Sequence, residues 1–295
     1  MTYSDCTITV TDSTGNVSSS LTITSFIVDT TAATLVEVTV VTTPDNDTTP
    51  DYTFSSDEAG TITYGGSCSS STTSATTDNN TITLVSLSDG TYSNCTITIT
   101  DTTGNVSNSL TIISFTVDTT APTVAQVTAV TTPTNDNTPD YTFSSSEAGT
   151  ITYGGSCSSS TTSATTDNNT ITLVSLSDGT YSNCTITVTD NSSNSVTLNI
   201  SSFVIDTTAP TVSSIYPTDN QSRVSITENI LVTFSEAMDT TSVTTNTSNT
   251  TCSGSFALSL NNFSSCVQMS SSPSSSNSDK SFTVDPSDDY SGPHK

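Results

Sequence analysis

A fixed repeat is the feature of this sequence that most constrains its fold. A junction motif of the type Asp-Thr-Thr-Ala occurs three times, as Asp29-Thr30-Thr31-Ala32-Ala33, Asp118-Thr119-Thr120-Ala121-Pro122 and Asp206-Thr207-Thr208-Ala209-Pro210. Cysteines recur with the same spacing of 89 residues in two series, one of Cys6, Cys95 and Cys184, the other of Cys68 and Cys157. This period exceeds the roughly 20–50 residues of solenoid and propeller repeats and suits a small β-sandwich domain of about 100 residues. The sequence therefore predicts an array of sandwich modules joined at the Asp-Thr-Thr segments.

The junction motifs divide the chain into four parts. Residues 30–118 and 119–206 are whole modules, residues 1–29 match only the last part of a module, and residues 207–295 form a divergent and incomplete one. Each whole module contains short runs of Val, Ile, Tyr and Phe that alternate with Thr and Ser. This period of two is typical of half-buried antiparallel strands, and no stretch has a convincing helical period.

About seven strands are expected in module 119–206, which is the signature of an all-β sandwich. They are predicted at Thr123–Val130, Tyr141–Ser145, Gly149–Tyr153, near Ala164, at Asn169–Val174, Thr180–Thr189 and Val196–Ile205. The strand over Thr180–Thr189 is the longest, with Cys184, Ile186 and Val188 on one face. Tyr181 near its start resembles the tyrosine corner of immunoglobulin-like sandwiches. The distance to Cys184 is one residue longer than in that pattern, which predicts a bulge near Ser182-Asn183.

The two ends of the chain read as partial modules. Residues 1–29 carry two expected strands, Cys6–Thr11 and Leu21–Val28, and two strands alone are marginal in water. Either the rest of this module lies upstream in the natural protein or another chain supplies it. We favour truncation, because Cys6 has no obvious partner. The last module has Ile230–Met238 as its clearest strand and a low-complexity loop at Ser271–Asn277. Because it differs in type from the first part, closure of one incomplete end by the other is not expected.

The charge of the chain is strongly one-sided. It has 28 acidic and three basic residues, a formal net charge of −25, and no Lys or Arg before Arg223. Such a surface cannot neutralise nucleic-acid phosphates, and an anionic membrane surface repels it. Metal cations are its natural counterions, although the acidity can also serve only to keep a Ser/Thr-rich surface soluble. No apolar run is long enough to span a membrane, and the first residues lack the features of a signal peptide, which suggests a fragment.

Seven cysteines without metal-type CxxC spacing indicate disulfides and an oxidising compartment. Three pairs are expected: Cys68 with Cys95, Cys157 with Cys184, and Cys252 with Cys266. Cys6 is then left over. Chain-entropy arithmetic gives roughly 3.5 kcal/mol of stabilisation for each of the two equivalent repeat pairs. Free buried thiols are the alternative interpretation.

Three motifs in order resemble tandem bacterial immunoglobulin-like domains. They are the junction Asp-Thr-Thr-Ala-Pro, the turn Asn135-Asp136-Asn137-Thr138-Pro139 and the strand ending Thr100-Asp101-Thr102-Thr103-Gly104-Asn105. The resemblance covers residues 1–208. The last module is similar to the S-layer-type bacterial Ig-like domain through Phe234-Ser235-Glu236-Ala237-Met238-Asp239. Cysteines are atypical of many such repeats, and the third copy, Asp190-Asn191-Ser192-Ser193-Asn194, lacks the Gly and one residue, so its loop is expected to differ.

The resemblance implies a fold and a role. It implies all-β modules, a tandem array of Ig-like antiparallel β-sandwiches, in a long cell-surface adhesin or biofilm protein with Ca²⁺ stiffening its joints. The expected function is an extracellular stalk or fibre region with other copies, cell-surface or matrix ligands as partners and no membrane insertion. Two alternatives stay open: a subunit of an extracellular filament assembled by β-strand exchange, and accessory modules of a secreted carbohydrate-active enzyme.

The acidic residues at strand ends and junctions are the candidate metal ligands. They are Asp12, Asp29, Asp47, Asp101, Asp118, Asp136, Asp140, Asp190 and Asp206. Asp101, Asp118 and either Asp136 or Asp140 are expected to converge at a joint. Asp and Asn side chains with backbone carbonyls suit Ca²⁺, which takes six to eight oxygen ligands, although nothing resembles an EF-hand loop. The alternative is that these residues only cap turns.

Catalysis finds little support in the sequence. His294 is the only histidine, so a Ser/His/Asp or Cys/His arrangement is absent from the predicted modules. The pair Asp57-Glu58 could in principle cleave glycosides, but its counterpart is Ser146-Glu147 and a turn is the expected role. Asn-x-Ser/Thr sequons such as Asn94-Cys95-Thr96 leave glycosylation open.

Overall fold

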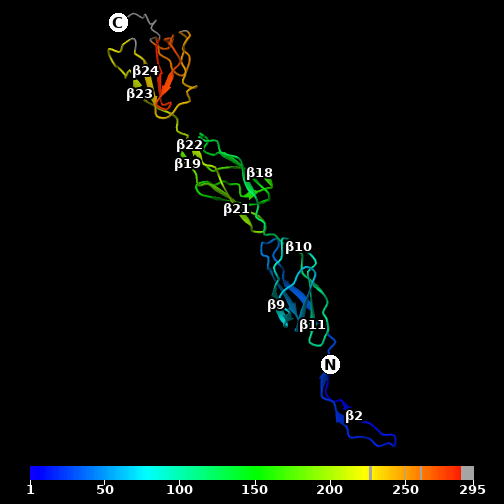
Figure 1. Ribbon diagram of the computed structural model, residues 1–295. Coiled ribbons are helices and arrows are strands. Elements are labelled where there is room, and N and C mark those ends of the chain that lie inside the picture. Colours follow the sequence, from blue (N-terminus) through cyan, green and yellow to red (C-terminus); the bar gives the residue numbers. More distant parts are fainter. Residues whose placement is uncertain (226–227, 249, 260, 287–295) are drawn as a thin grey trace. The chain divides into compact units, whose positions relative to one another are not determined.

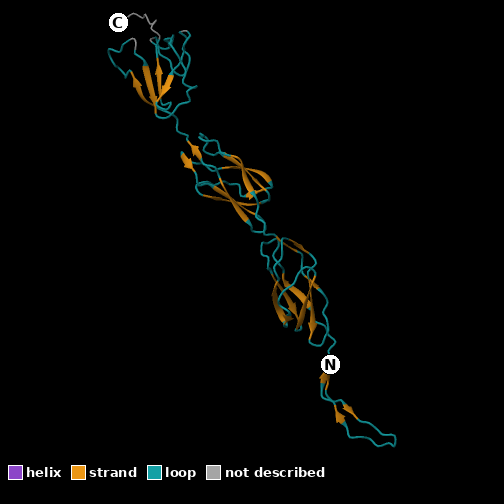
Figure 2. Ribbon diagram, viewed as in Figure 1, coloured by secondary structure: helices purple, strands orange, loops and turns teal. Residues whose placement is uncertain are grey.

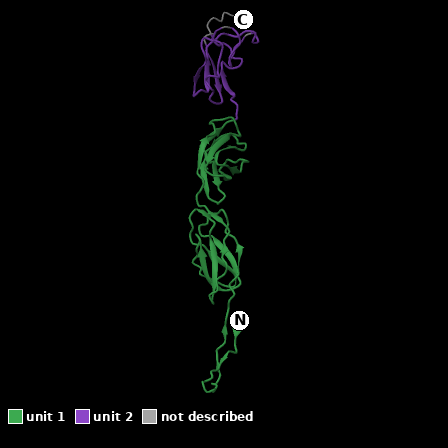
Figure 3. Cartoon of the chain, turned by 90° about the vertical axis from the view of Figure 1, so that its right-hand side faces the viewer, with its two compact units in different colours: residues 1–206 green, residues 207–295 purple. Residues whose placement is uncertain are grey.

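The computed structural model describes residues 1–225, 228–248, 250–259 and 261–286 (Figure 1). Every regular element in these residues is a β-strand, and all strand pairings are antiparallel (Figure 2). The chain divides into two compact units, residues 1–206 and 207–295 (Figure 3). The predicted all-β class, with Ig-like sandwiches in series, is confirmed. No helix in the described part of the chain is long and apolar enough to cross a membrane.

The first unit contains two hydrophobic cores, one within residues 33–117 and one within residues 130–205. Around the second core, one sheet has the order β14-β15-β18 and the facing sheet the order β17-β16-β20-β21, while β19 pairs with β22. The strands are β14 (Val124–Thr128), β15 (Asp140–Ser145), β16 (Gly149–Gly154), β17 (Ser163–Ala164), β18 (Asp167–Thr172), β19 (Gly179–Tyr181), β20 (Thr185–Thr189), β21 (Ser195–Asn199) and β22 (Phe203–Ile205).

The first core repeats this arrangement. One sheet has the order β5-β6-β9, its partner has the order β12-β11-β7-β8, and β10 pairs with β13. The strands are β5 (Leu35–Thr39), β6 (Asp51–Ser56), β7 (Gly60–Gly65), β8 (Ser74–Ala75), β9 (Asp78–Thr83), β10 (Gly90–Tyr92), β11 (Thr96–Asp101), β12 (Leu110–Thr111) and β13 (Phe115–Val117).

Alternation along the strands builds each core. Tyr141 and Phe143 on β15 and Ile186 and Val188 on β20 are buried, while the threonines between them are partly exposed. Because successive side chains of a strand point to opposite faces, the Thr residues lie on the outer faces and the apolar residues between the sheets. Phe203 on β22 is also fully buried, and its ring stacks on Tyr181 with centroids 5.3 Å apart.

The prediction of continuous strands over Thr180–Thr189 and Val196–Ile205 is wrong, because each segment forms two strands with different partners. β19 pairs with β22, whereas β20 pairs with β16 and β21. The interruption falls at Ser182–Cys184. There the Asn183 side chain accepts a hydrogen bond from the Ser156 backbone N–H, and Cys184 is bonded to Cys157. Both contacts lie at the interruption and hold the chain there against the segment that follows β16.

The tyrosine corner is present in both whole modules. The Tyr181 hydroxyl donates to the carbonyl of Ser177 at 2.9 Å, and the Tyr92 hydroxyl donates to the carbonyl of Ser88 at 2.8 Å. Each bond reaches back four residues and ties the start of the strand to the preceding turn. This is the arrangement that immunoglobulin-like sandwiches use at the same place.

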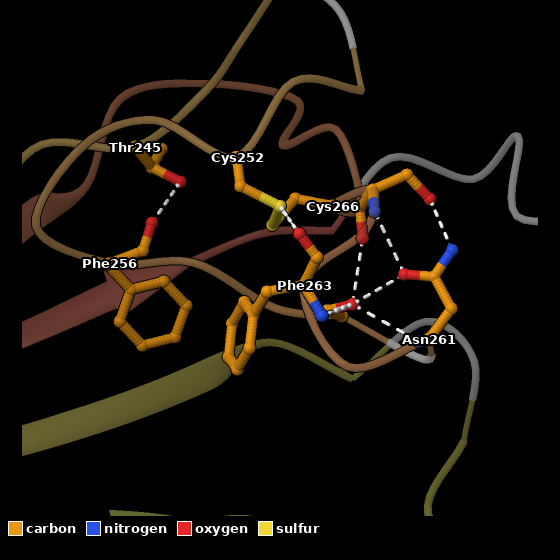
Figure 4. The surroundings of a disulfide bond; sticks show 8 residues. Thr245, Cys252, Phe256, Asn261, Phe263 and Cys266 are labelled. Atoms are coloured by element: carbon orange, nitrogen blue, oxygen red, sulfur yellow. Dashed lines mark hydrogen bonds between the residues drawn. A yellow bond between two sulfur atoms is a disulfide. The ribbon is translucent and has the colours of Figure 1, made fainter.

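The structure joins the three expected cysteine pairs. Cys68 is bonded to Cys95 and Cys157 to Cys184, and in both pairs the cysteines are 27 residues apart in sequence. The third pair, Cys252 and Cys266, closes 14 residues in the second unit (Figure 4). Cys6 is free and partly exposed.

Residues 1–29 form a narrow hairpin of two-residue strands. β1 (Thr2–Tyr3) pairs with β4 (Phe26–Ile27), and β2 (Thr7–Ile8) pairs with β3 (Leu21–Thr22). Of the two strands predicted here, Cys6–Thr11 is shortened to β2, and Leu21–Val28 is divided into β3 and β4, as its counterpart in the first whole module is divided into β12 and β13. Most of the apolar side chains of this hairpin are exposed.

The second unit has one four-stranded sheet of order β23-β24-β26-β25. Its strands are β23 (Val212–Tyr216), β24 (Ile230–Phe234), β25 (Ser274–Ser276) and β26 (Ser281–Val284). Ser271–Asn277 was expected to be a loop, yet its centre forms β25, since an edge strand can pair through its backbone whatever its side chains. The strand predicted at Ile230–Met238 ends at Phe234. His294 and Lys295 lie outside the described residues.

Candidate acidic metal centres

Two groups of three carboxylates form within the first unit, and each has one residue from a junction and two from the following module. The Glu58 cluster consists of Asp29, Glu58 and Asp101, and the Glu147 cluster of Asp118, Glu147 and Asp190. Within each cluster, one oxygen from every residue lies within 4.8 Å of the other two. The clusters are equivalent, because their members are 89 residues apart in sequence.

In the Glu147 cluster, three different elements supply the carboxylates. Asp118 directly follows β13, Glu147 lies in the turn between β15 and β16, and Asp190 directly follows β20. Asp190 is only 9% exposed. One oxygen of Asp190 accepts the backbone N–H groups of Ser192 and Asn194 at 2.8 and 2.9 Å, which fixes the carboxylate at the start of the β20–β21 turn.

The junction is also hydrogen-bonded to that turn. The Asn194 side-chain amide donates to the Asp118 carbonyl at 2.8 Å and to the Asp190 carboxylate at 3.0 Å. The Ser192 hydroxyl donates to the Asp118 carboxylate at 3.2 Å. The β20–β21 turn therefore holds the backbone and the side chain of the residue that begins the junction.

The Glu58 cluster uses the same scheme with one difference. Asp101 accepts the backbone N–H groups of Thr103 and Asn105 at 2.7 and 2.9 Å, and the Asn105 amide donates to the Asp29 carbonyl at 3.2 Å. Gly104 stands in this turn with φ of +98°, a conformation that favours glycine. The third copy, which lacks this Gly, places Ser193 at φ of +71° and gains the hydroxyl contact from Ser192.

The pKa of each cluster's glutamate is raised by its surroundings. Desolvation, followed by repulsion from Asp29 and Asp101, raises the pKa of Glu58. Desolvation and the charges of Asp118 and Asp190 raise the pKa of Glu147 in the same way. Burial also opposes the charge of Asp101, but hydrogen bonds from Asn105 and Thr103 outweigh it and lower the pKa of Asp101 well below its usual range.

The donor set fits a hard divalent cation. Ca²⁺ binds carboxylate oxygens at about 2.3–2.6 Å, so two ligands on opposite sides of one ion lie about 5 Å apart, consistent with the 4.8 Å limit within each cluster. In addition, Oε2 of Glu58 is buried and accepts no hydrogen bond from the described residues. A cation at the cluster would satisfy that oxygen and relieve the repulsion among three like charges.

The grouping differs from the expected meeting of Asp101, Asp118 and Asp136. Asp101 ends β11 and Asp118 follows β13, and the chain reverses between these two strands, so the two residues leave the module at opposite ends. Asp101 therefore meets Asp29 of the preceding junction, while Asp118 meets Asp190 of the next module. The sequence analysis predicts only a turn role for the two glutamates. Their recurrence 89 residues apart, each just after a strand, is the signal in the sequence that points to them.

The remaining predicted ligands lie outside both clusters. Asp47 and Asp136 cap their own turns through the N–H groups of Thr49 and Thr138. Asp140 accepts the hydroxyl of Thr172 at 2.6 Å. Asp12 accepts hydrogen bonds from Asn16 and Thr14, which lower its pKa, as in the turn at Asp101. These residues, with Asp206, are not among the clustered carboxylates of the described residues.

Asp89 is a junction residue that sequence reasoning missed. Its carboxylate accepts the backbone N–H and the hydroxyl of Thr119 at 3.0 and 2.7 Å, and the hydroxyl of Thr120 at 2.8 Å. These bonds lower the pKa of Asp89. The signal was its position immediately before Gly90, in the turn that faces the end of β13.

Asp57 has a structural role in the fold. It accepts the Thr34 backbone N–H at 2.6 Å, and Ser146 accepts the equivalent Thr123 N–H at 2.8 Å in the next module. A serine can thus replace this carboxylate, which agrees with the expected turn role of Asp57.

Comparison with known families finds a similarity in the last part of the chain. Residues 206–294 match the model of a bacterial Ig-like domain, a non-catalytic type of module. No curated protein matches the chain significantly. Such domains and disulfide bonds are typical of extracellular or surface proteins.

Proposed function

We propose that this chain is an extracellular structural region of a bacterial surface protein, a stalk or fibre that spaces or presents an adhesive part. The bacterial Ig-like match, the repeated sandwich modules and the disulfide in each of them support this role. Other copies of the protein, or ligands on a cell surface or in a matrix, are the proposed partners.

The observation that carries the proposal is the way the junction after β13 is fastened. From one module, Asp89 binds Thr119 and Thr120, and from the next, Asn194 and Ser192 bind Asp118. A flexible tether needs no such bonds, whereas a stiff spacer does, because they resist bending of the junction relative to the modules that it joins.

We further propose that Ca²⁺ binds at the Glu58 and Glu147 clusters. In each cluster, the cation would join the junction aspartate, Asp29 or Asp118, to two carboxylates of the following module. The bound cation would replace the repulsion among the three carboxylates with attraction of each carboxylate to the cation, and would so stiffen the junction. The competing interpretation is that Asp101 and Asp190 only cap their turns, which their hydrogen bonds also satisfy.

Removal of the cation tests this proposal. A ligand that binds only the folded state at 100 times its Kd stabilises it by about 2.7 kcal/mol. Residues 1–295 should therefore melt at a higher temperature with Ca²⁺ than with chelator, and scattering should report a stiffer array. Glu58→Gln with Glu147→Gln should remove most of this response, whereas Asp136→Asn should preserve it as the matched control. An unchanged melting point and maximum dimension would refute the calcium proposal.

Two alternatives remain distinct from the stalk. A filament assembled by β-strand exchange is favoured by one observation, the exposed apolar face of the hairpin 1–29. Accessory modules of a secreted carbohydrate-active enzyme would be indicated by a catalytic domain in the full open reading frame.

A further inference from the structure

The first half of each whole module is where the two modules differ most along one edge. Residues 58–98 and 147–187 have the same sequence, whereas residues 30–57 and 119–146 differ at eight positions. These positions lie in β5, in the segments on both sides of it and in the turn after β6. Since the neighbouring module is otherwise so similar, it serves as an internal control for what this edge does.

Three of the eight positions exchange an acidic residue for a neutral one. They pair Glu37 with Gln126, Asp45 with Thr134, and Asp57 with Ser146. Each neutral residue keeps the hydrogen bond of its acidic counterpart. The Tyr52 hydroxyl donates to Glu37 at 3.1 Å. The Tyr141 hydroxyl donates to Gln126 at 3.2 Å.

The other two pairs behave in the same way. The side chain of Asp45 accepts the backbone N–H of Asp47 at 3.2 Å. The side chain of Thr134 accepts the backbone N–H of Asp136 at 3.1 Å. The third pair accepts equivalent N–H groups just before β5 and β14, as described above. The fold therefore needs a hydrogen-bond acceptor at each of these positions, but it does not need the negative charge.

Exposed valines run along the same edge. β5 pairs with β6 and with no other strand in the described part of the chain. Val36, Val38 and Val40 alternate along it and are 56%, 47% and 48% exposed. Two of their counterparts in the second module are alanines, Ala125 and Ala129. Because β14 of the second module is an edge strand too, the open edge belongs to the module type and not to its place in the chain.

The row of valines lies between negative charges. Asp57 binds the backbone directly before β5, Glu37 lies within β5, and Asp45 lies beyond its end. An apolar strip with acidic residues at both ends is complementary to an apolar segment with basic ends. A second copy of this chain does not offer such a segment, since it has 28 acidic and three basic residues and no Lys or Arg before Arg223.

We propose that this edge of module 30–118 binds an extended segment of another protein, in which apolar residues alternate and Lys or Arg stand at both ends. The segment lies beside β5 as an added strand, with its apolar side chains on the valines and its basic ends near Asp57 and Asp45. The second module lacks these charges and two of the valines, so its edge does not bind. The site is separate from both acidic clusters and needs neither calcium nor the stalk role.

A labelled synthetic peptide, in which Val alternates with Thr between Lys residues at both ends, is the probe. Its anisotropy should report one binding site on the full chain 1–295, measured with chelator so that no divalent cation takes part. The affinity should fall when the ionic strength rises from about 0.1 M to about 1 M, because salt screens the charges. A peptide with Glu in place of Lys should not bind, and equal binding of both peptides would overturn the proposal.

The second module supplies substitutions that this fold already contains. Replacing five edge residues of the first module by those of the second should weaken peptide binding at least about tenfold, because apolar contact and charge are lost together. These substitutions are Val36→Ala, Glu37→Gln, Val40→Ala, Asp45→Thr and Asp57→Ser. Val85→Ala is the matched control and should leave the affinity unchanged, since Val85 is 45% exposed and its counterpart Val174 is the same residue at 46%.

The reverse replacement tests whether these residues are sufficient. It should create a second site, so that two peptides bind each chain. Its substitutions are Ala125→Val, Gln126→Glu, Ala129→Val, Thr134→Asp and Ser146→Asp. Calorimetry checks that both variants keep the folding transitions of the two modules.

Three further results would overturn the proposal. One is an unchanged affinity after the first replacement. Another is the lack of a second site after the reverse replacement in a chain that calorimetry shows to be folded. The third is self-association of 1–295 that the first replacement abolishes, which would make a second copy the occupant of the edge.

Discussion

Removing the disulfide of one module tests the energetics of the array most simply. The bond between Cys157 and Cys184 closes 27 residues of sequence separation. For a loop of this length, the loss of chain entropy in the unfolded state amounts to about 3.5 kcal/mol at 25 °C. Cys157→Ala with Cys184→Ala should therefore destabilise module 119–206 by roughly that amount. For a module of this size, the melting temperature should fall by about 15–25 °C.

Calorimetry of the full chain provides the assay and its control. The variant should show one transition at a lowered temperature for module 119–206, while module 30–118 should unfold at an unchanged temperature. Cys68→Ala with Cys95→Ala should shift the other module by a similar amount, because the two bonds close equal loops. In the unaltered chain, reductant should lower the melting temperatures of both modules. A shift equivalent to less than about 1 kcal/mol in either variant would refute the argument that loop closure dominates.

Three further predictions concern the site, the core and the compactness of the modules. Without added cation, Glu147→Gln should raise the melting temperature near pH 7. The pKa of Glu147 is raised in the folded state, so the charged carboxylate destabilises the fold increasingly as the pH rises from the unfolded pKa of 4.5 through the folded pKa. The increase in melting temperature should therefore vanish below about pH 4.5. An equal increase at all pH values would contradict this explanation. Phe203→Ala should cost about 3–5 kcal/mol in urea unfolding, since Phe203 is 1% exposed in the core; a loss under 1 kcal/mol would refute the burial. A broad-specificity protease should cut residues 30–206 rapidly only after reduction and unfolding, whereas rapid cutting of the oxidised form would argue against compact modules.

The all-β fold could be predicted because apolar and polar residues alternate along a half-buried strand. Ile186 and Val188 alternate with threonines, and both are buried. The break between β19 and β20 could not be predicted, since it depends on where the chain crosses from one sheet to the other. Tyr181 and the extra residue before Cys184 signalled an irregularity there, but not the change of partner.

The acidic clusters show a different limit. Sequence order places Asp101 and Asp118 close together, but the intervening strands reverse direction and send them to opposite ends of a module. The correct neighbours of Asp118, which are Glu147 and Asp190, follow only from antiparallel pairing in three dimensions. The repeat does place equivalent residues in both clusters, because the members of one lie 89 residues from those of the other.

The central claim is that the modules form a load-bearing array, and single-molecule extension of residues 1–295 tests it most directly. The two whole modules should unfold as separate, abrupt events. With the disulfides intact, each event should be shorter, because the loop between the bonded cysteines, which stand 27 residues apart in sequence, cannot extend. Reduction should lengthen each event by roughly 84–92 Å, which is the extended length of that loop at about 3.3–3.6 Å per residue less the 5.2 or 5.3 Å that the bonded Cα atoms already span. Smooth extension without discrete events, or event lengths unchanged by reduction, would contradict the account.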